Sequence, residues 1–121
     1  MSQHRVLIID DDPSLLRSIR LTLSVEGYAV ETAVDGIDGL ERVAQNAFDA
    51  IVVDLSMPRM DGRSFYRELR ARGNETPVLI LSAYGAHGAR SELKAQAALD
   101  KPFDPDHLIE IVGEMMDGGT G

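Results

Sequence analysis

Residues 6–15, VLIIDDDPSL, change from an apolar run to a cluster of acidic side chains. The run Val6–Ile9 is followed directly by three carboxylates, Asp10, Asp11 and Asp12. A short apolar run that is bounded by Asp is typical of a strand covered on both faces. Neighbouring carboxylates repel one another and are costly to remove from water. Unless they lie exposed in a turn, the stretch therefore predicts a positively charged group among them.

The size and charge of the chain limit the classes of protein that it can represent. It has 121 residues, no cysteine and a net charge of −8, which fits one domain with a single core and excludes disulfides. An acidic chain lacks the basic stripe that nucleic acids and anionic membranes attract, and it favours a cation or a basic partner. The apolar runs are too short for a signal peptide or a membrane span. We expect a single cytoplasmic domain over residues 1–121, with no direct contact to nucleic acid or membrane.

Apolar runs and helical periods alternate along the whole chain. The expected strands are 5–9, 28–33, 48–55, 76–82 and 98–100. The expected helices are 13–26, 35–47, 63–73, a loop plus helix within 83–97, and 104–116. The order strand–helix, repeated five times, predicts an α/β fold with a parallel sheet and helices on both faces. We expect the core to span about residues 4–117, with a flexible tail over 117–121.

Polar side chains close four of the five expected strands. They are Asp10 and Asp11 after the first strand, Asp54 at the third, Ser82 at the fourth and Lys101 after the fifth. In parallel sheets, ligands bind at the carboxyl ends of the strands. These side chains are therefore expected to meet in one crevice.

Their chemistry suits a phosphoryl group beside a metal ion. Clustered carboxylates bind a hard divalent cation, and magnesium usually takes one or two carboxylates together with a phosphate. An ammonium and a hydroxyl neutralise and hydrogen-bond the remaining phosphoryl oxygens. A carboxylate in the same crevice can act as a nucleophile and form an aspartyl-phosphate.

Four stretches together resemble the receiver domain of two-component response regulators: VLIIDDDP, VVDLSMPRMDG, VLILSA and DKPF. The resemblance covers the whole chain. It implies a (βα)5 doubly wound, five-stranded parallel sheet with strand order 2-1-3-4-5, in a flavodoxin-like three-layer sandwich. It also implies a signalling domain, not an enzyme, whose only reactions are its own phosphotransfer and dephosphorylation.

The resemblance assigns a role to each residue of the crevice. Asp54 matches the phosphoacceptor and a metal ligand. Asp11 would bind Mg²⁺ directly and Asp10 mostly through water, while Ser56 would offer its backbone carbonyl; Mn²⁺ is an alternative ion. Ser82 matches the hydroxyl that hydrogen-bonds the phosphoryl group.

Lys101 matches the lysine that pairs with the phosphoryl group, and the peptide bond before Pro102 is typically cis in the family. The donor would be a sensor histidine kinase or a histidine phosphotransfer protein. Phosphorylation would shift a pre-existing conformational equilibrium. A partner or a second copy would then bind the face formed by the fourth helix, fifth strand and fifth helix. Whether an output domain follows in a longer parent chain is left open.

The chain departs from the family pattern before the lysine. Ala98 stands where many relatives carry an aromatic residue that swings inward on phosphorylation, so that account does not apply as it stands. We expect the fourth helix to be short or mobile, with the switch passing through Ser82 and the loop at Ala83 and Tyr84. Tyr84 is either a loop aromatic or a residue that limits water at the phosphoryl group.

Three other functions compete with this interpretation. A phosphatase of the haloacid-dehalogenase type would use Asp10 as its nucleophile within the D-x-D spacing, but Pro13 and Ser14 replace the Gly and Thr that should follow. A degenerate receiver would act as a constitutive binding module, against which the intact acidic set argues. A flavodoxin would need backbone donors for the flavin phosphate where this chain has acidic side chains.

Overall fold

The computed structural model describes residues 3–83 and 86–118. The strands are β1 (Arg5–Ile9), β2 (Ala29–Ala33), β3 (Ala50–Asp54), β4 (Val78–Ser82) and β5 (Ala97–Asp100). The helices are α1 (Pro13–Val25), α2 (Gly36–Gln45), α3 (Gly62–Ala71), α4 (Ala86–Leu93) and α5 (Pro105–Gly118). Within the described residues, no helix has the length and apolar character that crossing a membrane requires.

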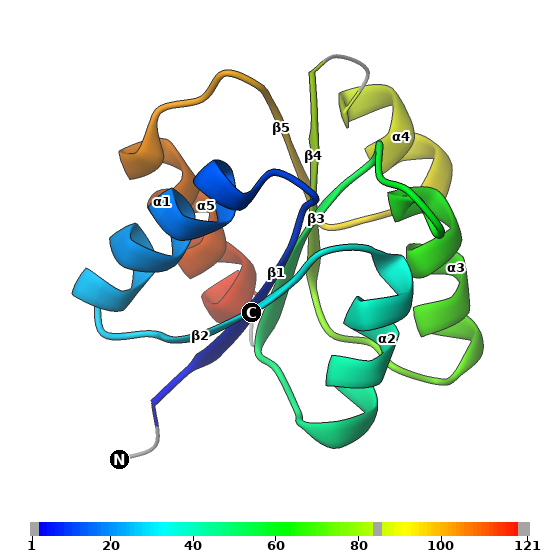
Figure 1. Ribbon diagram of the computed structural model, residues 1–121. Coiled ribbons are helices and arrows are strands. Elements are labelled where there is room, and N and C mark those ends of the chain that lie inside the picture. The colour runs from blue at the N-terminus through cyan, green and yellow to red at the C-terminus, as the bar shows by residue number, and fades with distance from the viewer. Residues whose placement is uncertain (1–2, 84–85, 119–121) are drawn as a thin grey trace.

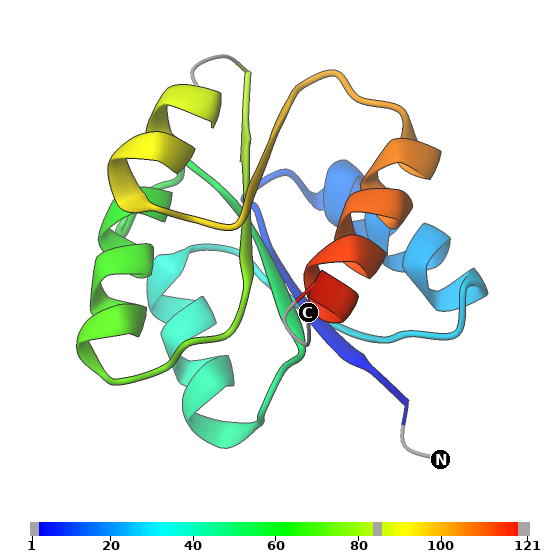
Figure 2. The ribbon, with the colours of Figure 1, turned by 180° about the vertical axis from the view of Figure 1, so that it is seen from behind.

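The strands form one parallel sheet in the order β2-β1-β3-β4-β5. Helices α1 and α5 cover one face of the sheet and α2, α3 and α4 cover the other, so that three layers result (Figures 1 and 2). Each connection between parallel strands passes through a helix on one of these faces. The predicted doubly wound fold and its 2-1-3-4-5 strand order are confirmed.

The apolar run of β1 contributes to two core clusters, one on each face of the sheet, where a single core was expected. Leu7 and Ile9 pack into the cluster beneath α2, α3 and α4, whereas Val6 and Ile8 pack into the cluster beneath α1 and α5. Successive strand residues point to opposite faces, so a central strand needs apolar side chains at every position. This explains why β1 is a continuous apolar run that ends abruptly at the carboxylates.

Helix α1 begins at the acidic stretch itself. The Asp12 side chain accepts hydrogen bonds from the backbone N–H groups of Ser14 and Leu15, and Pro13 occupies the first turn. An Asp cap followed by Pro satisfies free N–H groups and starts the helix directly after the strand. Asp12, the third carboxylate after β1, therefore caps α1.

Several element boundaries differ from the sequence-based expectation. Strand β4 begins at Val78 because Pro77 has no N–H to donate to a strand ladder. Strand β3 begins two residues later than expected and β5 one residue earlier. Helix α4 has only eight residues, as the expectation of a short fourth helix requires. Helix α5 continues into the expected tail, of which residues 119–121 lie outside the described part.

Candidate functional site

Strand register brings the predicted site residues to one edge of the sheet. Ile9 of β1 pairs with Val53 of β3, so the next residues, Asp10 and Asp54, lie at the same level. On the other side, Ser82 pairs with the last residue of β5, and its carbonyl accepts a hydrogen bond from the Lys101 N–H at 2.7 Å. The carboxyl ends of four neighbouring strands therefore supply the side chains of one site, as expected for a parallel sheet.

Lys101 supplies one positive group among the carboxylates. Its Nζ donates to Asp10 Oδ2 at 2.9 Å and lies 3.4 Å from Asp54 Oδ1. Asp10 is fully buried and Asp54 is 5% exposed, so both carboxylates have lost most of their contact with water. Because buried charges require a partner, the ammonium offsets a cost that the two carboxylates would otherwise impose on the fold.

Both oxygens of Asp10 accept hydrogen bonds. Oδ2 faces Lys101, and Oδ1 accepts the backbone N–H of Asp12 at 2.9 Å. The second bond also orients the backbone at the start of α1. Asp10 thus links Lys101, which directly follows β5, to the turn after β1, a structural role that the sequence alone did not indicate.

Burial and neighbouring charge perturb the acid–base properties of the site. Burial raises the pKa of the Asp54 carboxyl, and the adjacent Asp10 charge raises it further, while Lys101 acts in the opposite direction. Burial alone would lower the pKa of Lys101, but its hydrogen bond to Asp10 and the charges of Asp10 and Asp54 raise it overall. Lys101 therefore remains an ammonium, whereas ionised Asp54 needs further positive charge.

Three carboxylates meet closely enough to hold one metal ion. Oxygens of Asp10, Asp11 and Asp54 all lie within 4.8 Å of one another, and Asp11 faces solvent while the other two are buried. An oxygen-only set with one open side suits a hard divalent cation that keeps several waters. The residues present fit Mg²⁺, and the cation would offset the charge that burial leaves on Asp54.

A cleft of about 780 Å³ opens over Asp54. Its lining includes the predicted residues Asp54, Ser56, Ser82 and Lys101, so the geometry brings these four together. Two charged residues that were not predicted, Asp61 and Arg63, also line it. Asp61 lies within the stretch VVDLSMPRMDG that carries the family resemblance, and Arg63 follows shortly after it, but neither was assigned a role.

The loop between β3 and α3 is tied to the start of α2. Arg59 Nε donates to Asp35 Oδ2 at 2.6 Å, and the Gly36 N–H donates to the Met60 carbonyl at 3.0 Å. Asp35 is buried, and its side chain also accepts the Asp38 N–H as the cap of α2. This pair holds the loop that carries Ser56, and sequence inspection missed it because the partners are far apart in the chain.

Three features that the family resemblance singled out have different outcomes: Ala98, the peptide bond before Pro102, and Tyr84. Ala98 is buried at 8% exposure, with a small side chain at the position of the usual aromatic. The Lys101–Pro102 peptide bond is cis, as the family resemblance implies. Tyr84, for which one hypothesis was that it limits access of water to the phosphoryl group, lies outside the described residues.

Comparison with known proteins identifies the family. The family model of the response regulator receiver domain matches residues 6–113, which make up most of the chain. The chain belongs to the response regulator receiver family. It is thus a receiver domain of two-component systems, a signalling domain. The predicted family membership is confirmed.

Two curated relatives and two solved structures illustrate the similarity. The response regulator MprA of Mycobacterium leprae (strain TN) is 41% identical over 115 residues, which are 93% of this chain and 50% of that protein. MprA of Mycobacterium sp. (strain KMS) is 40% identical over 108 residues, 87% of this chain and 47% of the relative. This receiver domain therefore spans about half the length of the curated relatives it matches.

The solved structures match over nearly their full length. The receiver domain of the Francisella response regulator 1452 has a TM-score of 0.90 and 32% identity, covering 97% of this chain and 99% of that one. The chemotaxis protein CheY4 of Vibrio cholerae has a TM-score of 0.87 and 31% identity, covering 94% and 99%. The receiver fold therefore accounts for nearly all of this chain.

Proposed function

We propose that this receiver accepts a phosphoryl group on Asp54 in a magnesium-dependent reaction. The observation that carries the proposal is the set of three carboxylates within 4.8 Å of one another, two of which share the Lys101 ammonium. Such a set costs stability unless a cation joins it, and Asp54, one of its members, lines an open cleft that leaves room for a donor. Structural packing alone gives no reason for this arrangement.

The proposed chemistry uses the residues that surround the cleft. An Asp54 carboxylate oxygen attacks the phosphorus of a phosphohistidine; the new O–P bond forms as the P–N bond breaks, and the imidazole leaves with that electron pair. Lys101 balances charge on the phosphoryl oxygens, and the Ser82 hydroxyl donates to one of them. Hydrolysis of the acyl phosphate by water later returns Asp54 to its carboxylate form.

The metal would be held by Asp10, Asp11, Asp54 and the backbone carbonyl of Ser56. When bound, Mg²⁺ supplies positive charge to the phosphoryl oxygens and removes repulsion among the carboxylates. Asp11 is the exposed member of the set and so the most accessible direct ligand. Asp10 already has both oxygens in hydrogen bonds, which supports a role through water.

The family and the half-length match to the curated relatives support the proposed partners. A sensor histidine kinase or a histidine phosphotransfer protein donates the phosphoryl group in the cytoplasm. The signal passes to a partner, to a second copy through the α4-β5-α5 face, or to an output domain in a longer parent chain. Residues 4–117 act as one receiver unit in each case.

Incubation with acetyl phosphate, a small phosphodonor, tests the proposal by intact mass spectrometry. We expect one added phosphoryl group in the presence of Mg²⁺, a much smaller fraction of labelled protein after chelation with EDTA, and none in Asp54→Asn. The label should map to Asp54. Labelling that persists unchanged in Asp54→Asn, or in EDTA, would refute the assignment.

The same experiment separates the competing functions. A haloacid-dehalogenase-type phosphatase would carry the label on Asp10, yet Asp10 is fully buried and both its oxygens are engaged. A degenerate receiver would take no label under any condition. The geometry favours Asp54 because it lines the open cleft and Asp10 is not among the lining residues.

A further inference from the structure

Two arginines on α3 hold a single carboxylate on α4. Arg63 Nη2 lies 3.4 Å from one oxygen of Glu92, and Arg67 Nη2 donates to the other oxygen at 2.8 Å. The arginines are four residues apart and therefore project from the same side of α3. Glu92 thus fastens α4 to α3 through two guanidinium groups.

The two arginines differ in what else they face. Arg63 lines the cleft over Asp54 together with Ser82 and Lys101. Arg67 instead lines a separate hollow of about 490 Å³ between α3 and the end of α4. Arg63 therefore reaches the cleft over Asp54, whereas Arg67 lines a different hollow.

Phosphorylation changes the charge that Arg63 faces. A phosphoryl group brings nearly two negative charges and three strong acceptor oxygens. Lys101 is already engaged by Asp10 and Asp54, and among the described residues that line the cleft Arg63 is the other cation. A guanidinium presents a planar fork of donors that suits phosphoryl oxygens.

The contact that Arg63 must give up is weak. Its side chain is 38% exposed and that of Glu92 is 48% exposed, so water screens their attraction. Glu92 also retains Arg67 at the shorter distance, so it is not left without a partner. A phosphoryl group on the nearly buried Asp54 competes from a less hydrated position and should win the exchange.

We propose that Arg63 is a phosphoryl-binding residue that exchanges Glu92 for a phosphoryl oxygen when Asp54 is phosphorylated. The inference rests on the proposed function and adds a specific route from the site to α4. It gives this receiver a link that does not depend on an aromatic residue at position 98, where Ala98 lies buried.

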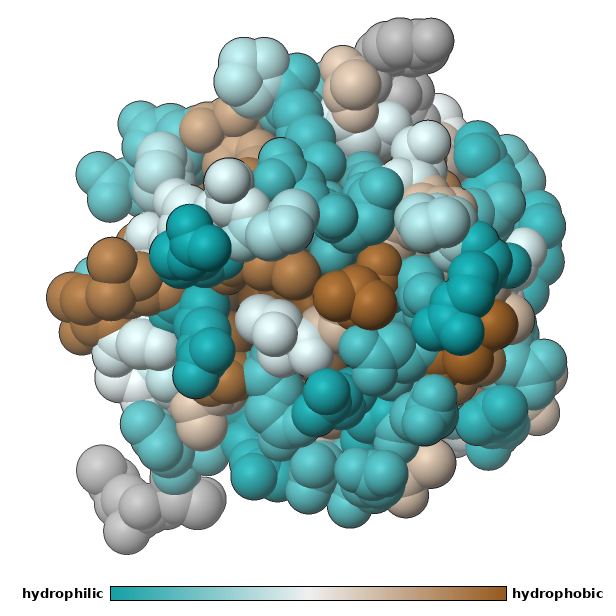
Figure 3. Space-filling view, viewed as in Figure 1, coloured by the Kyte–Doolittle hydropathy of each residue, from teal (hydrophilic) through white to brown (hydrophobic). Residues whose placement is uncertain are grey.

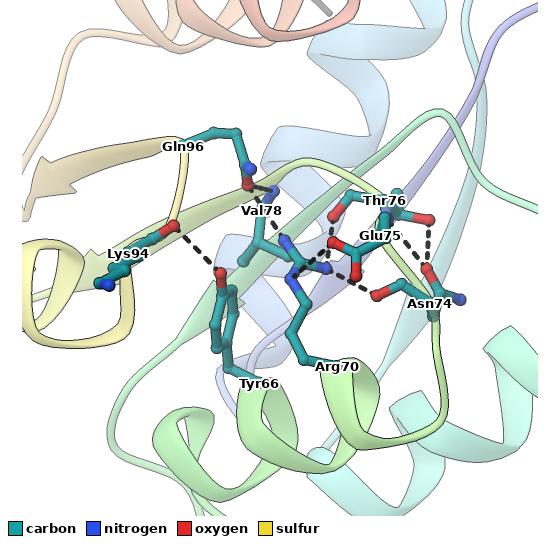
Figure 4. Close-up of polar contacts among 8 residues, drawn as sticks. All are labelled: Tyr66, Arg70, Asn74, Glu75, Thr76, Val78, Lys94 and Gln96. Atoms are coloured by element: carbon teal, nitrogen blue, oxygen red, sulfur yellow. Dashed lines mark hydrogen bonds and ion pairs between the residues drawn. The ribbon is translucent and has the colours of Figure 1, made fainter.

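Other contacts keep α3 and α4 together when Glu92 loses one arginine. The Tyr66 hydroxyl donates to the Lys94 carbonyl at 3.2 Å, directly after the end of α4 (Figure 4). Arg70 donates to Gln96 Oε1 at 3.2 Å, and Gln96 lies between α4 and β5 (Figure 4). The exchange therefore loosens one attachment of α4 without detaching the helix, and Arg63 variants should fold.

The first test measures the affinity for beryllofluoride, a phosphoryl mimic, with saturating Mg²⁺ by ¹⁹F nuclear magnetic resonance. Arg63→Gln should bind the mimic roughly fivefold more weakly than wild type because a charged donor is lost. Arg67→Gln is the matched control, because it also removes one positive charge and one arginine partner of Glu92 from α3. The affinity of this variant for the mimic should stay within about twofold of wild type. Equal losses in the two variants would overturn the proposal.

The second test removes the competitor. Glu92→Gln should bind the mimic about two- to fivefold more tightly, because Arg63 no longer has to leave a carboxylate. In the Arg63→Gln background the same substitution should have no effect. A Glu92→Gln effect that is independent of Arg63 contradicts the exchange. If wild-type protein fails to bind the mimic at all, the proposed function fails; if it binds but the variants do not differ, only this inference fails.

Discussion

At the scale of single residues, several side chains of the site also have a structural role in the fold. Asp10 is fully buried, binds Lys101 and fixes the turn at Asp12. Asp12 in turn caps α1. Of the three carboxylates that follow β1, only Asp11 has no such structural bond in the described residues. Asp11 is therefore the member of the acidic stretch that is available to the proposed metal ion.

The buried carboxylate Asp35 provides a prediction of pH dependence. The hydrogen bond from Arg59 lowers the pKa of Asp35, against the effect of burial. A carboxyl whose pKa is lower in the folded state adds stability above its unfolded pKa of about 3.9, and that stability is lost as pH falls through the folded pKa. Asp35→Asn keeps a good helix cap but removes the ion pair.

We therefore expect Asp35→Asn to lower the free energy of unfolding by about 1 kcal/mol near neutral pH, and the difference from wild type to shrink below about pH 4. Urea unfolding at several pH values measures this. Asp61→Asn is a suitable control, because Asp61 caps α3 in the same way while lying exposed, and it should change stability by less than about 0.5 kcal/mol. A deficit in Asp35→Asn that persists unchanged at low pH would contradict the ion-pair explanation.

At the scale of elements, the close contact between α3 and β3 positions Asp54. Gly62 begins α3 and donates its N–H to the Leu55 carbonyl at 3.0 Å. A Cβ at position 62 would lie 2.9 Å from the Leu55 Cα and 3.0 Å from the Asp54 carbonyl carbon. These are backbone atoms of the segment that carries Asp54, and they cannot rotate away as a side chain could.

Gly62→Ala should therefore lower the free energy of unfolding by about 1–3 kcal/mol through overpacking. Gly88→Ala is the opposite case: Gly88 lies inside α4, and apart from its chain neighbours and the nearby backbone of the helix, no atom of the described residues lies within 4 Å of a new Cβ. Alanine favours helix over glycine, so this substitution should raise stability by up to about 1 kcal/mol. Chemical denaturation of both variants measures the contrast. A neutral Gly62→Ala would show that the β3–α3 junction can relax.

The elements also show how far sequence patterns can predict this fold. Strand ends were predictable because apolar runs stop at polar residues, and register then places Asp10 beside Asp54. Helix α4 was less clear because its buried side chains are only Ala86 and Ala89, which give a weak periodic signal. Pairs such as Arg59 with Asp35 were not predictable, since their contact depends on how the loop and α2 meet in space.

At the scale of the whole molecule, negative charge and an uneven apolar surface stand out. The net charge is −8, so nonspecific cations also stabilise the folded chain to some degree. Apolar side chains gather over α1 at one side of the molecule (Figure 3), where Leu21 is 66% and Val25 is 77% exposed. Because of the net charge, any test of metal binding must separate binding at a specific site from general screening of charge.

Two neighbouring carboxylates make that separation possible. Asp11 belongs to the carboxylate cluster, whereas Asp12 caps α1, and both are exposed. Each Asp→Asn change removes one charge, and Asn caps a helix as well as Asp does. The two variants therefore have equal net charge and differ in whether the cluster is intact.

Binding of Mg²⁺ to the folded state alone should stabilise wild-type protein by about 2.7 kcal/mol at a hundredfold excess over Kd. For a chain of this length, that corresponds to a rise in Tm of roughly 10 °C. Asp12→Asn should retain this rise and Asp11→Asn should lose most of it, with NaCl at matched ionic strength as the baseline for both. Equal rises in the two variants would mean that Mg²⁺ acts on the net charge of the whole protein. The cluster of Asp10, Asp11 and Asp54 would then not be a specific metal site.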